Sequence, residues 1–278
     1  MTAWYVALDV LREAASRRWL LALFALIAAL LITVGLSLEM RVVDGALAAV
    51  KLFGQEEREV TVQAVDVALR PLFRGVSFFI FCGGLFFGAL VPADFAPSLL
   101  APGRIEHLLS LPVRRASLLL GTYVGVLIIA AVAFLFAAGG FVLVLGVKTG
   151  AYVADLVYAG LLGALTFAAL YGAMLTCAVF VRSAAASAFA GLLLFAAGIV
   201  ASFRYEISPS FSSDFARQVF EWVTMFLPPV ATVGQLAMDI AASTPVDSGA
   251  LARTMGGMVL FGVAMVALGV WRFERMDF

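Results

Sequence analysis

The sequence has 278 residues, of which 64% are hydrophobic and only 13% are charged, against roughly 45–50% and about 25% in a soluble domain. A water-soluble fold cannot bury that excess, so the composition excludes a soluble globular protein. The 18 basic residues balance the 18 acidic ones, and the net charge gives no indication of a nucleic-acid partner. We therefore expect one all-α membrane domain over residues 1–278.

Residues 1–19 precede the first long apolar stretch and have a helical pattern of their own. Charged residues lie on one side of this pattern, and two tryptophans lie on the other. That arrangement favours an amphipathic helix in the membrane surface over a simple extension of the first span into water. The apolar stripe consists of Trp4, Leu8, Leu11, Ala15 and Trp19.

Six stretches are long enough, or nearly so, to cross a bilayer. A spanning helix needs about 20 mostly apolar residues, because each backbone polar group must find its partner within the segment. The sequence therefore predicts six transmembrane helices. The stretches are Leu20–Leu38, Leu72–Val91, Leu118–Val147, Val157–Val181, Ala184–Phe203 and Gly249–Trp271. The first is too long for a signal-peptide core and lacks a cleavage site behind it, so we expect it to be retained.

Arginine placement predicts the orientation. If the N-terminus is cytoplasmic, the short loops on that side hold more basic than acidic residues, and the opposite side holds more acidic ones. The positive-inside rule then places both termini in the cytoplasm.

The loops on the outer side are unequal, because residues 39–71 and 204–248 are long and 148–156 is short. We expect amphipathic helices in the long outer loops. In 204–248 two helical patterns flank the Pro228–Pro229 pair, and neither is long enough to span. In the first long loop the spacing of Val60–Leu69 leaves both helix and strand open.

Several kinds of chemistry are missing from the sequence. No span has an ionisable side chain near its centre, which argues against a carrier that binds its own driving ion. No G-x-x-x-x-G-K-[ST] motif occurs, so we expect no intrinsic ATPase and no enzyme activity. Cys82 and Cys177 have no ligand partners at metal spacing, so we predict no metal site and no disulfide. For the polar residues within the spans, we expect hydrogen bonds to helix carbonyls rather than to a substrate.

The most informative segment is the loop at residues 92–117, between the second and third spans. Prolines suit its first-turn positions, and Ile105, Leu108 and Leu109 give a short helix one apolar face. Such a helix at the membrane surface either rests on lipid or docks in a groove of another protein. His107 has no catalytic partner at suitable spacing, so we interpret it as a surface residue.

This loop carries a resemblance to a known family. The order of interfacial helix, six spans and the segment Gly103-Arg-Ile-Glu-His-Leu-Leu-Ser-Leu-Pro-Val-Arg-Arg115 resembles the membrane subunit of type-2 ABC exporters. The ending Trp271-Arg-Phe-Glu-Arg-Met-Asp-Phe278 is similar to the closing Phe-x-Arg-Arg-Asp of that family. One departure is Gly103-Arg104, where family members usually have Gly-Ser or Gly-Thr.

The resemblance implies a permease in a bacterial inner membrane, paired with a second copy or a sister permease. A separate cytoplasmic ATPase would bind ATP and Mg²⁺ and drive the permease through the 92–117 loop. The residues that this implies for ATPase coupling are Asp94, Pro97, Arg104, Glu106, His107, Arg114 and Arg115.

Two small-x-x-x-small pairs allow close helix packing, either between permeases or within one chain. They are Gly84 with Gly88, and Gly121 with Gly125. The phenylalanines of the second span would suit a hydrophobic or lipid-linked cargo, although phenylalanines at such positions more often face lipid.

Two other functions stay open. A relay subunit could pass ATPase motion through the 204–248 loop to a periplasmic partner, with nothing crossing the bilayer. A channel or carrier that acts alone is the weakest alternative, since the spans lack charge.

Overall fold

The computed structural model describes residues 2–276 apart from 44–45, 53–54, 57–62, 65–68, 111–112 and 151. For Trp19, His107, Leu109 and the strand residues it describes the backbone only. Among the described residues, six helices are long and apolar enough to cross a membrane. They are α2 (Arg18–Ser37), α4 (Arg70–Leu90), α7 (Arg115–Thr149), α8 (Asp155–Val181), α9 (Ala184–Ser202) and α13 (Ser248–Glu274). The predicted all-α class and the six spans are confirmed.

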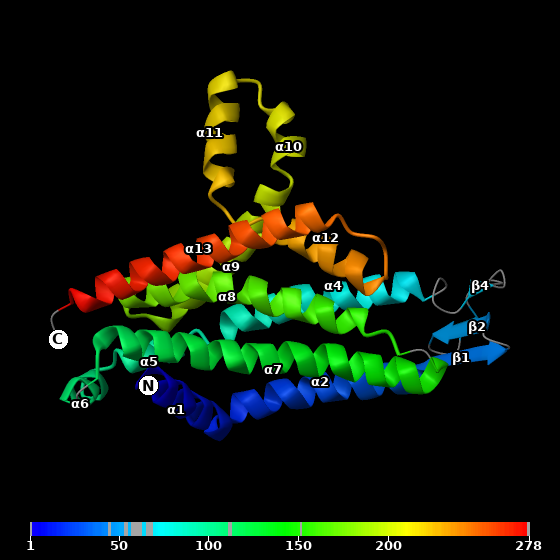
Figure 1. The fold of residues 1–278 in the computed structure, drawn as a ribbon, viewed down its shortest axis with the longest axis horizontal. Helices are drawn as coiled ribbons and strands as arrows, with labels where there is room; N and C mark the ends of the chain where they lie inside the picture. The colour runs from blue at the N-terminus through cyan, green and yellow to red at the C-terminus, as the bar shows by residue number, and fades with distance from the viewer. Residues whose placement is uncertain are drawn as a thin grey trace.

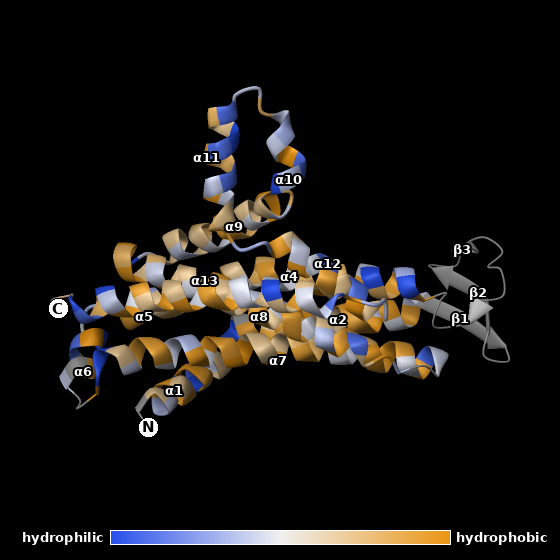
Figure 2. Cartoon of the chain, turned by 45° about the horizontal axis from the view of Figure 1, so that its top comes forward, coloured by the Kyte–Doolittle hydropathy of each residue, from blue (hydrophilic) through white to orange (hydrophobic). Residues whose placement is uncertain are grey.

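The six helices run along one common direction, with α8 at the centre of the bundle (Figure 1). Helix α8 packs against α13, α7, α12, α9 and α4, and most of its length is buried. Both chain termini lie at one end of the bundle, and the strands lie at the other. Coloured by hydropathy, the bundle is mostly apolar, with polar residues gathered towards its ends (Figure 2).

The N-terminal helix α1 (Thr2–Ser16) is separate from the first span, as predicted. The Trp4 indole is 56% exposed, but a neighbouring face of the helix is buried through Ala7, Val10 and Ala14. This buried face packs along α7. The small side chains on α1 let the two backbones come close, so α1 is part of the packed bundle as well as a candidate surface helix.

The first outer loop differs from the prediction. Its described parts form short strands, β1 (Leu38–Val43), β2 (Ala46–Leu52), β3 (Gln55–Glu56) and β4 (Gln63–Ala64). Strand β2 pairs antiparallel with each of the other three. The described parts of this loop are therefore strands and not amphipathic helices, and each strand satisfies its backbone on a neighbour. The segment Val60–Leu69, for which the sequence left both helix and strand open, lies mostly outside the described residues.

The second long outer loop is helical, as predicted. It contains α10 (Arg204–Ile207), a 3-10 turn (Ser208–Ser210), α11 (Asp214–Met225) and α12 (Val230–Ala241). Helices α10 and α11 form a hairpin that stands away from the bundle (Figure 1). After a bend of 58°, α12 packs into the bundle against α8 and α4, which buries Val233 and Ala237.

The contact between α1 and α7 gives a testable prediction. A Cβ on Gly121 would lie 2.5 Å from the Val6 Cβ and 2.6 Å from the Ala3 carbonyl oxygen. Gly121→Ala should therefore push α1 away from α7 and destabilise the protein by about 1–3 kcal/mol. Gly139→Ala is the matched control on the same helix, because nothing lies within 4 Å of its Cβ position. The control should be neutral or stabilising, since alanine favours helix.

Thermal unfolding of the detergent-purified variants measures the difference. Equal midpoints for the two variants would show that α1 does not pack on α7 in this way.

Candidate functional site

The loop between α4 and α7 folds into two short helices at the end of the bundle that holds both termini. Helix α5 comprises Phe95–Leu99, and α6 comprises Arg104–Ser110. Gly103 connects them with φ of +82°, in the left-handed region that glycine adopts without steric cost. The loop therefore has a definite backbone path rather than the form of an open linker.

An apolar cluster holds this loop on the bundle. Ile105 of α6 and Leu99 of α5 are almost fully buried. They belong to a core separate from the main one, which includes side chains at the adjoining ends of α7, α8 and α13. The other large members are Leu100, Leu118, Leu119, Leu175, Val179, Phe273 and Met276. Displacing the loop would expose this core to water, so apolar packing holds the loop on the three helix ends.

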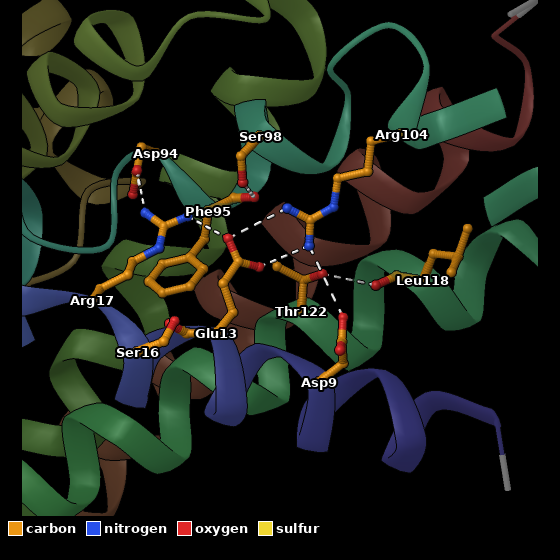
Figure 3. A network of polar contacts seen from close by, with 10 residues as sticks. All are labelled: Asp9, Glu13, Ser16, Arg17, Asp94, Phe95, Ser98, Arg104, Leu118 and Thr122. Atoms are coloured by element: carbon orange, nitrogen blue, oxygen red, sulfur yellow. Dashed lines mark hydrogen bonds and ion pairs between the residues drawn. The ribbon is translucent and has the colours of Figure 1, made fainter. Parts of the chain in front are cut away.

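A network of ion pairs joins the loop to α1 (Figure 3). Glu13 accepts hydrogen bonds from Arg104 on both carboxylate oxygens, at 2.7 Å and 3.3 Å. Arg17 donates to Glu13 and also to Asp94, and its guanidinium lies 4.6 Å from the centre of the Phe95 ring. Asp9 adds a longer contact of 4.0 Å to Arg104. Two arginines and three carboxylates thus tie α1 to the start of α5 and the start of α6.

The network is electrostatically favourable at neutral pH. The hydrogen bond from Arg104 is the largest influence on Glu13; it lowers the pKa of this carboxyl, and Arg17 adds to the effect against the opposing effect of burial. The same hydrogen bond raises the pKa of Arg104. Both shifts favour the charged forms, so the pair stays ionised and intact well below neutral pH.

The C-terminal segment is fastened to the same region. The Arg115 guanidinium donates to the Met276 carbonyl oxygen at 2.5 Å and lies 3.4 Å from the Glu274 carbonyl oxygen. Because Arg115 begins α7, this bond links the end of the chain to the end of the loop. Arg114, directly before it, is exposed.

The residues that the sequence analysis grouped for ATPase coupling divide into two sets. Asp94, Arg104 and Arg115 make contacts within the chain, whereas Glu106 and Arg114 are exposed. Pro97 lies within α5 and is partly buried. The side chain of His107, like Pro112, lies outside the described residues.

Sequence reasoning missed Glu13 and Arg17 as members of this site. Their i, i+4 spacing within α1 is a recognisable signal for an ion pair. Their partners Asp94 and Arg104 lie 77 and 91 residues further along the chain, and no spacing rule connects positions that far apart.

The four glycines singled out from the sequence all make close contacts within the chain. A Cβ on Gly84 would lie 2.4 Å from Phe134, and one on Gly88 would lie 2.8 Å from Phe167. Gly121 and Gly125 face Val6 and Val10 of α1 in the same way. These positions are occupied by the chain's own helices.

The described residues contain no group of three or more His, Cys, Asp or Glu side chains placed to hold a metal ion. The described contacts of the site are salt bridges and apolar packing.

Comparison with known families identifies the chain. Residues 4–278 match a family described as ABC-2 family transporter protein. Because the match covers nearly the whole sequence, the chain belongs to this family. It is a multi-pass membrane protein and the membrane component of a transporter, and this membership implies an ATPase partner. No curated protein matches the chain.

The Glu13 contacts predict a pH-dependent contribution to stability. Because the folded pKa lies below the ordinary value of 4.5, this contribution is complete above that value and is lost as the pH falls through the folded pKa. Glu13→Gln should therefore cost about 1 kcal/mol at pH 7, and the difference from the natural protein should shrink at lower pH. Asp9→Asn is the control, since Asp9 is mostly exposed and its contact is long.

Thermal unfolding across pH values tests this. A Glu13→Gln penalty that is the same at all pH values would rule out the ion pair as its cause.

Proposed function

We propose that this member of the ABC-2 family is a permease that pairs with a second permease and is driven by a separate ATPase docking on α5–α6. The observation that carries the proposal is the construction of this segment. Its inner face shares a core with α7, α8 and α13, whereas Glu106 on α6 points away from that core and is exposed. A protein bound at the exposed side could move the helix ends without breaking the bundle.

The proposed orientation places this end in the cytoplasm of a bacterial inner membrane. Both termini lie at the same end as α6 (Figure 1), and arginines concentrate there. The exposed ones include Arg12, Arg18, Arg114, Arg182, Arg272 and Arg275. A cytoplasmic ATPase could reach α6 only in this orientation, and the positive-inside rule favours it.

In this proposal the chain itself is not an enzyme. The full sequence has no phosphate-binding G-x-x-x-x-G-K-[ST] loop, so ATP and Mg²⁺ would be bound by the partner. Since Gly84, Gly88, Gly121 and Gly125 face helices of the same chain, the second permease would bind at a different surface.

A second candidate function has its own observation in the α10–α11 hairpin. This hairpin stands away from the bundle (Figure 1) and exposes Phe215, Trp222 and Phe226. At its base, Ser202 accepts hydrogen bonds from the backbone of Ala231 and Thr232. A hairpin fixed at its base could relay motion to a periplasmic protein without any transported substrate.

The ATPase-docking proposal predicts the effect of Glu106→Ala. The exposed carboxylate contributes nothing to the core, so the variant should fold normally. Loss of one charge-assisted contact of about 1.5–3 kcal/mol should weaken binding of the ATPase roughly tenfold or more. The measurement is the affinity between the purified permease and the ATPase, together with the stimulation of ATP hydrolysis.

Glu206→Ala is the control, since Glu206 is an exposed glutamate on α10, away from the proposed docking side. If Glu106→Ala binds and stimulates the ATPase like the control, Glu106 has no part in docking.

The relay alternative predicts the effect of replacing residues 205–226 with a short Gly-Ser linker, which keeps the Ser202 contacts at the base. A relay subunit would lose a periplasmic protein on copurification and keep its ATPase. A permease that only transports would keep every partner of the natural protein, and that result would exclude the relay.

A further inference from the structure

A long apolar groove runs along the bundle between α2 and α4. Its walls come from these two helices and its floor comes from α7, with Phe167 of α8. Helix α2 packs mainly on α7, and the groove separates it from α4. The groove extends along α4 from Pro71 at one end to Pro92 and Phe95 at the other. Every lining residue is Leu, Ile, Val, Phe, Pro, Ala or Gly.

The lining excludes polar occupants. No lining side chain can donate or accept a hydrogen bond, and an apolar cavity of this kind does not hold ordered water. A sugar, an ion or a peptide backbone in the groove would lose its hydrogen bonds to water without replacement.

The groove is long and narrow. The stretch from Pro71 to Pro92 is about 30 Å long at 1.5 Å per residue, and the groove has a volume of about 660 Å³. A hydrocarbon chain is long, thin and apolar enough to enter.

Glycines on α4 make the space. Gly75 and Gly83 line the groove, and nothing lies within 4 Å of a Cβ placed on either. Gly84 and Gly88 have a different role, because their missing side chains let α4 pack closely against Phe134 and Phe167. The groove is thus open where Gly75 and Gly83 face it, and its floor is closely packed.

Arginines lie near both ends of the groove. At the Phe95 end, Arg17 is paired with two carboxylates, and Arg18 at the start of α2 is exposed. At the other end, Arg70 directly precedes Pro71, is exposed, and forms no ion pair with any described residue. Arg74, one turn further, has a single partner in Asp239 at 2.7 Å. An exposed arginine therefore lies beside the Pro71 end of the groove, where it could pair with a phosphate.

We propose that this groove binds one acyl chain of a phospholipid, with the phosphate at the Arg70 end. The inference does not rest on ATPase coupling, because the chain alone holds the complete groove.

The experiment uses the full chain, purified in detergent, and two probes that carry a photoreactive diazirine in an acyl chain. One is a phosphatidylglycerol and the other is a diacylglycerol without phosphate. Peptide mass spectrometry locates and quantifies the adducts. We expect saturable labelling of the groove faces of α2 and α4. Labelling spread evenly over the outer surface of the bundle would overturn the proposal.

Separate variants test the binding site for the acyl chain and the binding site for the phosphate. Gly83→Trp, or Gly75→Trp if that variant does not fold, should reduce groove labelling by both probes at least tenfold. Gly139→Trp should leave it unchanged, because Gly139 also has an open Cβ position but does not line the groove. Equal labelling of the Gly83→Trp variant and the Gly139→Trp control would overturn the proposal that the groove binds an acyl chain.

Arg70→Gln should reduce labelling by phosphatidylglycerol about fivefold, the equivalent of one surface charge, and leave diacylglycerol labelling unchanged. An undiminished preference for phosphatidylglycerol in this variant would overturn the assignment of the phosphate to Arg70.

Discussion

Close approach of helix backbones at small residues is the constraint on which this bundle depends. In lipid, apolar side chains gain little by leaving one hydrocarbon environment for another, so helices associate through packing. The interface of α8 with α13 shows how. A Cβ on Gly172 would lie 3.1 Å from the Gly262 carbonyl oxygen, and one on Gly269 would lie 2.8 Å from the Thr176 hydroxyl. Thr176 also donates across the interface to Met265 at 2.6 Å, but such bonds average only about 0.6 kcal/mol, so packing contributes more.

The same constraint explains which parts of the fold could be predicted from the sequence. Each span must satisfy its own backbone, so length and apolarity alone identified α2, α4, α7, α8, α9 and α13 within a few residues. The hydroxyls of Thr122 and Thr166 bond to carbonyls of their own helices, and that of Ser187 bonds to Met174 on the neighbouring one, as expected. The expectation fails for Ser77 and Tyr171, whose buried hydroxyls have no hydrogen-bond partner among the described residues. Outside the spans, the backbone can choose its partners, and there the first outer loop formed strands where helices were expected.

The candidate site was predictable only in part, for a related reason. Pro97, Gly103 and Ile105 gave local signals for short helices, and those signals depend on neighbouring residues. The contacts of Glu13 with Arg104 and of Arg17 with Asp94 depend on how α1 lies on α7. That placement follows from Ala7, Val10 and Ala14, whereas the more visible stripe of large side chains led the sequence interpretation to a neighbouring face.

The two attachments of the α5–α6 segment differ in kind, and the difference bears on the proposed coupling. The apolar core beneath Leu99 and Ile105 is close-packed, so it transmits a push to α7, α8 and α13 but resists small rearrangements. The ion pairs with α1 are partly exposed and individually weak. Arg17 contacts both Glu13 and Asp94. If the loop shifted and one of these contacts lengthened, the Arg17 guanidinium would still be paired with the other carboxylate. The segment is thus fixed to three spans by packing and to α1 by ion pairs, and α1 is itself held on α7 by the close contacts at Gly121 and Gly125.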